Sequence, residues 1–242
     1  MHIYNLGNLI VNNYLIRING KIILIDTGYP NNFNKFLKKL KKLNIELSKI
    51  DYVFLTHAHD DHAGFLNEII DQTNAIIILD EIAKDRLLVG HNEWIGGCSG
   101  RIAKLFILLM GILGKSKHEY PKVELNERYI LFNGTNQPFE ENAIQLHVIR
   151  LPGHTEDSIG VYNKDVLFCG DAAMNGFPSI NNQIIWIENL EAYTETWDKM
   201  INLSVKEIYP SHGKKFNRLR LVKSRNKIDR IKILKISEPK YS

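Results

Sequence analysis

Residues 56–62 read Thr-His-Ala-His-Asp-Asp-His, a run that concentrates metal-binding side chains. Three of the nine histidines of the chain and two aspartates fall within these seven residues. Imidazole nitrogens and carboxylate oxygens are ligands that suit Zn²⁺ and neighbouring transition metals. The donors are too closely spaced for all of them to reach one tetrahedral ion, so two adjacent ions explain the pattern better. A solvated polar loop with chance histidines is the alternative interpretation.

Three more residues of the same kinds are found further along the chain. They are His154, Asp171 and His212, and each lies just beyond a short apolar run. The histidine run follows such a stretch as well, residues 52–55. Short apolar runs bounded by Gly or Pro indicate buried strands, and α/β folds usually place their chemistry beyond strand ends. We therefore expect the four loops to form one constellation.

The order of these residues resembles that of the metallo-β-lactamase superfamily of binuclear metallohydrolases. The resemblance rests on His57-x-His59-x-Asp61-His62, on His154, Asp171 and His212, and on the early run Ile23-Leu-Ile-Asp26-Thr-Gly28. It extends from the first strands to at least Gly213. It implies an α/β fold, the four-layer αββα metallo-β-lactamase sandwich, with mixed helices and strands that the periodicity also shows.

The resemblance also implies how seven ligands divide between two ions. The first ion would be held by His57, His59 and His154, the second by Asp61, His62 and His212, and both by Asp171. Asp26 would bind no ion and would orient a ligand imidazole, as metal-bound histidines generally require. We expect two Zn²⁺ ions per monomer, with Fe or Mn as other metals that the site could take.

On this resemblance the chain is a zinc-dependent hydrolase in which a hydroxide bridged between two Zn ions cleaves an ester-like bond. A lactone, a thioester or a related small molecule would be the substrate, and Asp61 would be catalytic by accepting a hydrogen bond from the hydroxide. Class B β-lactamases lack an equivalent of Asp171, which argues against an antibiotic-degrading enzyme. Two alternatives remain open: a phosphodiesterase or nuclease of the same superfamily, and an iron-dependent redox member.

Two residues near the ligands invite a closer look. Asp157 stands where the family often has Gly, and we expect its carboxylate to face solvent, as most aspartates do. Cys169 lies two residues before Asp171 but follows a buried-strand pattern, so we interpret it as a small core residue rather than a ligand. His91 and His118 are interpreted as ordinary histidines and not as a third metal site.

Length and composition favour one large domain over residues 1–242. Hydrophobic residues make up 44% of the chain and charged residues 24%, which is typical of a globular protein with a substantial core. The two cysteines are too few to indicate a disulfide framework. No secretory signal is evident, and the most apolar run, residues 105–114, is shorter than the roughly 20 residues that span a bilayer. We expect a cytoplasmic protein with a small-molecule substrate and no membrane partner.

Residues 81–127 are the least predictable region and read as a helical insertion. An apolar helix is predicted over 101–113, and it could be a lid, with part of Trp94 to Tyr120 bordering the metal cleft. It could equally be a packing helix or a homodimer contact, because an apolar helix must bury its face somewhere. The basic segment from Lys214 to Lys240 alternates cations with Leu and Ile, which favours a solvated amphipathic element. No aromatic stacking platform accompanies it, so we expect no nucleic-acid partner.

Pattern and turn chemistry predict the remaining elements. Asn19-Gly20 is a strong hairpin signal between two strands. The predicted strands cover 8–18, 21–25, 52–55, 75–79, 143–151, 159–162, 165–168 and 205–209, and the predicted helices cover 31–44, 65–70 and 190–203.

Overall fold

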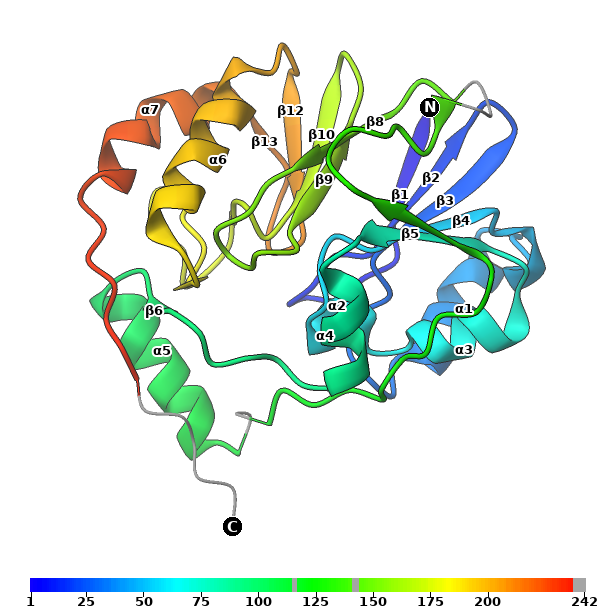
Figure 1. Ribbon diagram of the computed structural model, residues 1–242, viewed down its shortest axis with the longest axis horizontal. Helices are drawn as coiled ribbons and strands as arrows, with labels where there is room; N and C mark the ends of the chain where they lie inside the picture. Colours follow the sequence, from blue (N-terminus) through cyan, green and yellow to red (C-terminus); the bar gives the residue numbers. More distant parts are fainter. Residues whose placement is uncertain (115–116, 141–143, 237–242) are drawn as a thin grey trace. The chain divides into compact units, whose positions relative to one another are not determined.

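The computed structural model of the chain describes residues 1–114, 117–140 and 144–236. Contacts between residues divide the chain into two compact units, whose elements are labelled in Figure 1. Unit 1 comprises residues 1–92 and 119–149, and unit 2 comprises residues 93–118 and 150–242. The single-domain interpretation stays a prediction, and of the predicted insertion, residues 93–118 are grouped with unit 2.

Unit 1 is built on a six-stranded sheet with the order β1-β2-β3-β4-β5-β7. Its strands are β1 (His2–Asn5), β2 (Tyr14–Ile18), β3 (Lys21–Ile25), β4 (Tyr52–Phe54), β5 (Ile76–Asp80) and β7 (Tyr129–Phe132). The first three pair antiparallel, and β3, β4, β5 and β7 run parallel. The carboxyl ends of parallel strands meet at one edge of a sheet, so the loops that follow β3 and β4 are neighbours.

The predicted hairpin between β2 and β3 is confirmed. Asn19 and Gly20 both have positive φ, 49° and 77°, as a two-residue turn of the type favoured by right-handed strand twist requires. The first predicted strand is too long, however, because it begins at Tyr14 and not at residue 8. The side chain of Asn8 accepts hydrogen bonds from the backbone nitrogens of Ile10 and Val11, and this local turn replaces the extended backbone.

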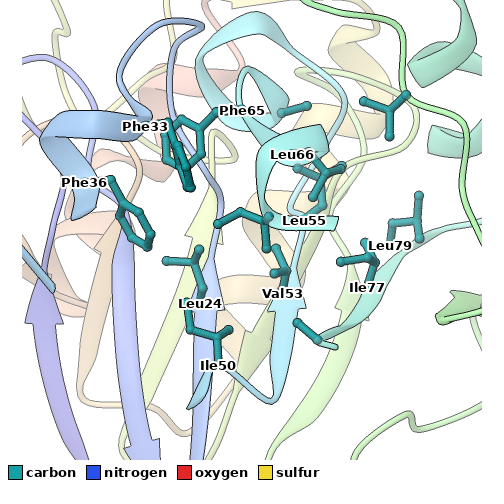
Figure 2. Close-up of a cluster of buried hydrophobic side chains, with 14 of the residues drawn as sticks. Leu24, Phe33, Phe36, Ile50, Val53, Leu55, Phe65, Leu66, Ile77 and Leu79 are labelled. Carbon is teal, nitrogen blue, oxygen red and sulfur yellow. The ribbon is translucent and has the colours of Figure 1, made fainter. Parts of the chain in front are cut away.

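Helices cover the sheet of unit 1 and form its core. They are α1 (Phe33–Lys42), α2 (Asp60–Ala63), α3 (Leu66–Gln72), α4 (Ala83–Val89) and the short 3₁₀ helix η1 (Leu47–Lys49). Figure 2 shows Phe33 and Phe36 of α1 against Phe65, with ring centroids 5.3–6.4 Å apart, over Leu24 and Val53 of the sheet. Phe65 lies three residues after His62, so this aromatic cluster anchors the end of the histidine run in the core.

Unit 2 contains most of a second sheet, with the order β13-β12-β10-β9-β8, and a small pair, β11-β6. The strands are β6 (Gly97–Cys98), β8 (His147–Arg150), β9 (Ile159–Tyr162), β10 (Val166–Gly170), β11 (Trp186–Ile187), β12 (Glu207–Pro210) and β13 (Phe216–Asn217). The chain passes from unit 1 to unit 2 within β8. Of the strand predicted over 143–151, residue 143 lies outside the described residues, and the strand itself begins at His147.

Three helices complete unit 2: α5 (Arg101–Ile112), α6 (Leu190–Asn202) and α7 (Leu219–Ile228). Tyr193 and Trp197 of α6 are fully buried, and the Trp197 indole donates to the carbonyl oxygen of Ala172 at 3.0 Å. Arg225 of α7 forms a two-pronged ion pair with Asp198 of α6. These contacts hold the helices against the sheet and fix the loop that follows β10.

The segment after α7 is extended and pairs with β6 through a bridge between Cys98 and Leu234. Leu221 and Ile228 bury the apolar face of α7, as the amphipathic interpretation of the basic segment requires. Residues 237–240 of that predicted segment lie outside the described residues. No helix in the described part of the chain is long and apolar enough to cross a membrane.

Candidate metal centre

The histidine run leaves the buried strand β4 and turns into the one-turn helix α2. His57, His59, Asp61 and His62 are all buried, although each carries a strongly polar side chain. Burying four such groups is costly unless each finds a partner of matching chemistry. The loop is therefore built to hold these groups together and cannot be the solvated polar loop of the alternative interpretation.

Asp26, the first residue after β3, orients two of the imidazoles. Its Oδ1 accepts from the backbone nitrogen of Thr56 at 2.8 Å, and its Oδ2 lies 2.9 Å from the Thr56 hydroxyl and 2.8 Å from Nδ1 of His62. A carboxylate has no proton to give, so Nδ1 of His62 donates. The Thr56 hydroxyl uses its one proton on Asp26 and accepts from Nδ1 of His57 at 3.1 Å. Both rings thus keep the lone pair of Nε2 available for a metal.

The metal-facing atoms of this loop fall into two pairs. Nε2 of His57 lies 3.2 Å from Nδ1 of His59, and Nε2 of His62 lies 3.4 Å from Oδ1 of Asp61. Two atoms bound at about 2.0–2.2 Å to one tetrahedral ion lie roughly 3.3–3.6 Å apart. Each pair is therefore close to the spacing of two ligands on a common ion.

The loop is also clamped from the side of β3. The carbonyl oxygen of His62 accepts from the backbone nitrogen and the hydroxyl of Thr27, at 2.7 and 2.8 Å. Gly64 passes so close to this segment that an added Cβ would lie 2.3 Å from the nitrogen of Pro30 and 2.4 Å from the carbonyl oxygen of Gly28. Only glycine fits there, which explains why the histidine run is followed by Ala-Gly.

Two contacts of the loop were not anticipated from the sequence. The side-chain amide of Asn92 donates to Oδ1 of Asp60, and its oxygen accepts from the backbone nitrogen of Asp60, both at 2.8 Å. The buried hydroxyl of Tyr120 lies 3.1 Å from the carbonyl oxygens of Ala58 and Arg86. Neither Asn92 nor Tyr120 belongs to a motif, and both are distant in sequence from the loop. Their contacts with the loop could therefore not be predicted from the sequence.

In unit 2, a backbone carbonyl orients His154. Its Nδ1 lies 2.8 Å from the carbonyl oxygen of Trp186 in β11. A carbonyl oxygen can only accept, so Nδ1 carries the proton and Nε2 keeps its lone pair. The Trp186 indole donates to the carbonyl oxygen of Ile95 at 2.7 Å and packs edge-on against Trp94, with centroids 5.2 Å apart. The start of the predicted insertion thus supports the strand that orients a ligand.

Asp171 and His212 follow β10 and β12, which are parallel neighbours. Oδ2 of Asp171 lies 3.5 Å from Nε2 of His154 and 3.3 Å from Nε2 of His212. Both spacings match those of atoms that share an ion. One carboxylate oxygen is therefore close to two imidazoles that the prediction gives to different ions, which is the arrangement expected of a bridging ligand.

Asp157 does not face solvent, and the prediction for it is wrong. The carboxylate is fully buried within a turn in which the Thr155 and Ser158 hydroxyls lie 2.7 Å apart. The backbone nitrogen of Leu151 donates to the carbonyl oxygen of Ser158, so the segment folds back on itself and turns Asp157 inward. Cys169 is a buried core residue, as predicted. This burial raises the pKa of its thiol, so the thiol stays protonated.

Comparison with known proteins agrees with this geometry. The chain matches the model of the metallo-beta-lactamase superfamily over residues 6–212, a span that contains Asp26 and all seven predicted ligands. The chain belongs to the metallo-β-lactamase superfamily. Each of the seven residues is a candidate metal ligand in the described part of the chain. His91 and His118 are not among those candidates.

Individual relatives of this superfamily member are distant in sequence. A beta-lactamase-like protein 2 homolog of Caenorhabditis elegans is 28% identical over 207 residues, which are 84% of this chain and 55% of that protein. A hydroxyacylglutathione hydrolase of Psychromonas ingrahamii is 28% identical over 139 residues, 55% of this chain and 51% of that protein. The chain spans about half the length of these two relatives.

Solved structures confirm the predicted fold class. An archaeal metallo-beta-lactamase superfamily protein from Sulfolobus tokodaii matches with a TM-score of 0.65 and 21% identity, over 93% of this chain and 84% of that chain. At this identity the likeness shows the fold alone. The chain has the metallo-β-lactamase fold, and each unit contributes a sheet with its covering helices.

Proposed function

We propose that the ligands of the two units bind two metal ions, and that the chain uses these ions to hydrolyse an ester-like bond. The first ion is held by His57, His59 and His154, the second by Asp61, His62 and His212, and both by Asp171. Zn²⁺ is the metal that this nitrogen and oxygen donor set suits best. The substrate class is a small lactone, thioester or related acyl compound.

The position of Asp171 carries the proposal. Its Oδ2 lies between the Nε2 atoms of His154 and His212, at 3.5 and 3.3 Å. In unit 1 the pairs His57/His59 and Asp61/His62 repeat the same spacing. A site for one ion needs only one pair of closely spaced donor atoms in unit 1. The presence of two such pairs, and of a carboxylate close to two imidazoles in unit 2, supports two ions.

The chain prepares these ligands by placing protons away from the metals. Asp26 holds a proton on Nδ1 of His62, Thr56 holds one on Nδ1 of His57, and the Trp186 carbonyl holds one on Nδ1 of His154. Each Nε2 can then donate its lone pair to a metal, and the ring loses no proton when the metal binds. Fixed tautomers also raise metal affinity, because ring orientation is set before the ion arrives.

When bound, two such ions polarise an acyl carbonyl and lower the pKa of water to about 7, which provides a nucleophile at neutral pH. Asp61 directs Oδ1 toward Nε2 of His62 at 3.4 Å. We assign its second oxygen the role of accepting a hydrogen bond from the attacking water, so that a lone pair faces the substrate. Water oxygen then bonds to the acyl carbon, the bond to the leaving oxygen or sulfur breaks, and an acid and an alcohol or thiol are released.

The similarity to a hydroxyacylglutathione hydrolase supports an acyl substrate, since that relative is named for hydrolysis of an acylated thiol. The phosphodiesterase and redox alternatives gain no comparable support. Among the C-terminal cations, Arg225 is engaged by Asp198 and Asp229, and Lys215 by Glu207. These pairs reduce the positive charge that a phosphodiester chain would meet.

Turnover of a substrate panel by the zinc-loaded chain tests the proposal. We expect hydrolysis of lactones or thioesters, and little or none of phosphodiesters. Loss of that activity in His57→Ala, with activity retained in His91→Ala, would assign it to the metal ligands. Turnover confined to phosphodiesters, or acyl hydrolysis that survives His57→Ala, would contradict it.

A further inference from the structure

Helix α5 presents an apolar surface to solvent. From Leu105 to Gly114 the sequence has ten consecutive residues without a polar side chain, and of α5 only Ala103 is buried. Leu105, Leu109 and Ile112 are 69%, 51% and 83% exposed. They recur at the spacing of one helix face, so the exposure is a continuous stripe and not scattered side chains. Large exposed apolar patches mark interaction sites.

The stripe continues onto a neighbouring loop and is firmly attached to unit 2. The rings of Phe106 and Phe177 meet edge-on, with centroids 5.7 Å apart, while Phe177 stays 83% exposed. At its other end α5 follows β6, whose Cys98 exchanges two backbone hydrogen bonds with Leu234, at 2.9 and 3.0 Å. Figure 1 shows the segment that follows α7 running beside α5. These contacts therefore hold the apolar face of α5 in place on unit 2.

The charges in the two sequence segments that carry this surface are all of one sign. Between Trp94 and His118 the sequence has no Asp or Glu and has Arg101, Lys104, Lys115 and Lys117. The segment after α7 adds Arg230, Lys232 and Lys235, again with no acid from 230 to 236. Lys104 Nζ donates to the carbonyl oxygen of Lys235 at 3.0 Å, which brings the two cationic segments together. Cations at the N-terminus of a helix are unfavourable for its dipole, so helix stability does not explain Arg101 and Lys104.

We propose that α5, Phe177 and the flanking cations Arg101, Lys104 and Lys235 form a docking surface for an anionic lipid bilayer. The helix lies in the interface with its stripe toward the acyl chains, and Arg101, Lys104 and Lys235 reach lipid phosphates. The twelve residues of α5 are too short to span a bilayer, and interfacial docking needs no span. The expectation of no membrane partner rested on the length of the apolar run, which does not bear on this mode.

Charge decides between a bilayer and a second copy of the chain. In a symmetric dimer through α5, the same cations of both copies would face one another across the contact, and no acid of this surface would offset them. An anionic bilayer complements both properties of the surface. Its acyl chains match the apolar stripe, and its lipid phosphates match the flanking cations. The proposal is independent of the metal centre, and chelated protein should dock as metal-loaded protein does.

Flotation of the full chain with vesicles tests the proposal. We expect the protein to float with phosphatidylcholine vesicles that contain phosphatidylserine, to bind pure phosphatidylcholine vesicles much more weakly, and to be released by salt. Leu109→Glu should lower the partition coefficient about tenfold or more. Arg101→Gln should lower it about fivefold.

Two matched variants control for surface change alone. Leu219→Glu alters an apolar residue of α7 that is 56% exposed, close to the exposure of Leu109, and Lys38→Gln removes an exposed cation of α1. Both should bind vesicles as the wild type does. Equal binding to neutral and anionic vesicles, no binding, or a dimer in light scattering that Leu109→Glu dissociates would overturn the proposal. A changed ranking of acyl-chain lengths in Leu109→Ala, with no vesicle binding in the wild type, would show instead that α5 is a lid.

Discussion

The proposed ligands of unit 1 and unit 2 are oriented by different means. In unit 1 the imidazoles of His57 and His62 depend on side chains, because Asp26 and Thr56 hold their Nδ1 protons. In unit 2 the imidazole of His154 depends on a backbone carbonyl, that of Trp186. The same chemical result, a free lone pair on Nε2, is reached in both units. A substitution of a supporting residue can therefore disturb His57 or His62 more easily than His154.

Side-chain support can be removed by mutation, whereas carbonyl support moves only if the strand moves. Unit 1 also concentrates four ligands in six residues, while unit 2 gathers three ligands from three loops beyond β8, β10 and β12. We therefore expect metal affinity to be sensitive to distant single substitutions in unit 1. In unit 2 it should depend on the integrity of the sheet and of β11.

Removing a ligand should have the largest effect and should be equal in the two units. His57→Ala and His154→Ala each empty the first proposed site, and we expect hydrolytic activity to fall by about 10²–10⁴-fold, since a bound Lewis acid is worth several kcal/mol. Steady-state kinetics of both variants beside His91→Ala measure this. A variant of one unit that retains most activity would show that its histidine is no ligand.

Removing the support in unit 1 should have an intermediate effect. Asp26→Ala deprives His62 and Thr56 of their partner, and we expect metal affinity to fall about 10–100-fold. The buried backbone nitrogen of Thr56 loses its acceptor, so the free energy of unfolding should also fall by about 1–3 kcal/mol. Competition with a chelator and denaturant unfolding measure the two quantities.

Asp51→Ala is the matched control for Asp26→Ala. Asp51 accepts hydrogen bonds from the backbone nitrogen of Ile22 and from Lys21 at the opposite end of the same strand pair, β3 and β4. It should lower stability without lowering metal affinity. If both variants lost affinity equally, or if Asp26→Ala bound metal as the wild type does, Asp26 would have only a structural role.

Altering the corresponding residue in unit 2 should have the smallest effect. Trp186→Phe keeps the carbonyl that orients His154 and removes the indole hydrogen bond to Ile95. We expect metal affinity to change by far less than the roughly 10–100-fold expected for a lost orienting group. The same chelator competition checks this. A loss as large as that of Asp26→Ala would mean that the Trp186 side chain, and not its carbonyl, secures the ligand.

The sequence showed the parts of the site that repeat a local pattern. The spacing of His57, His59, Asp61 and His62 after an apolar strand indicated two ions, and Asn19-Gly20 indicated its hairpin, since turn chemistry is local. The resemblance supplied the role of Asp26 and the three distant ligands. What stayed hidden was held by partners without a motif, such as Asn92 on Asp60, and by the carbonyl of Trp186, which any residue could provide.

The errors have a similar origin. Asp157 was expected in solvent because most aspartates are exposed, yet the turn between Leu151 and Ser158 buries it. The strand predicted from residue 8 begins only at Tyr14, because the Asn8 side chain forms a local turn with Ile10 and Val11. In both places a local hydrogen bond outweighed the average preference of the residue, and such bonds depend on the folded backbone.

Metal content is the most direct test of the two-ion proposal. Elemental analysis of the chain, purified without chelator and loaded with Zn²⁺, should give about two ions per chain in the wild type and about one in Asp61→Ala, which empties only the second proposed site. A reproducible single ion in the wild type, unchanged in Asp61→Ala, would contradict the binuclear centre.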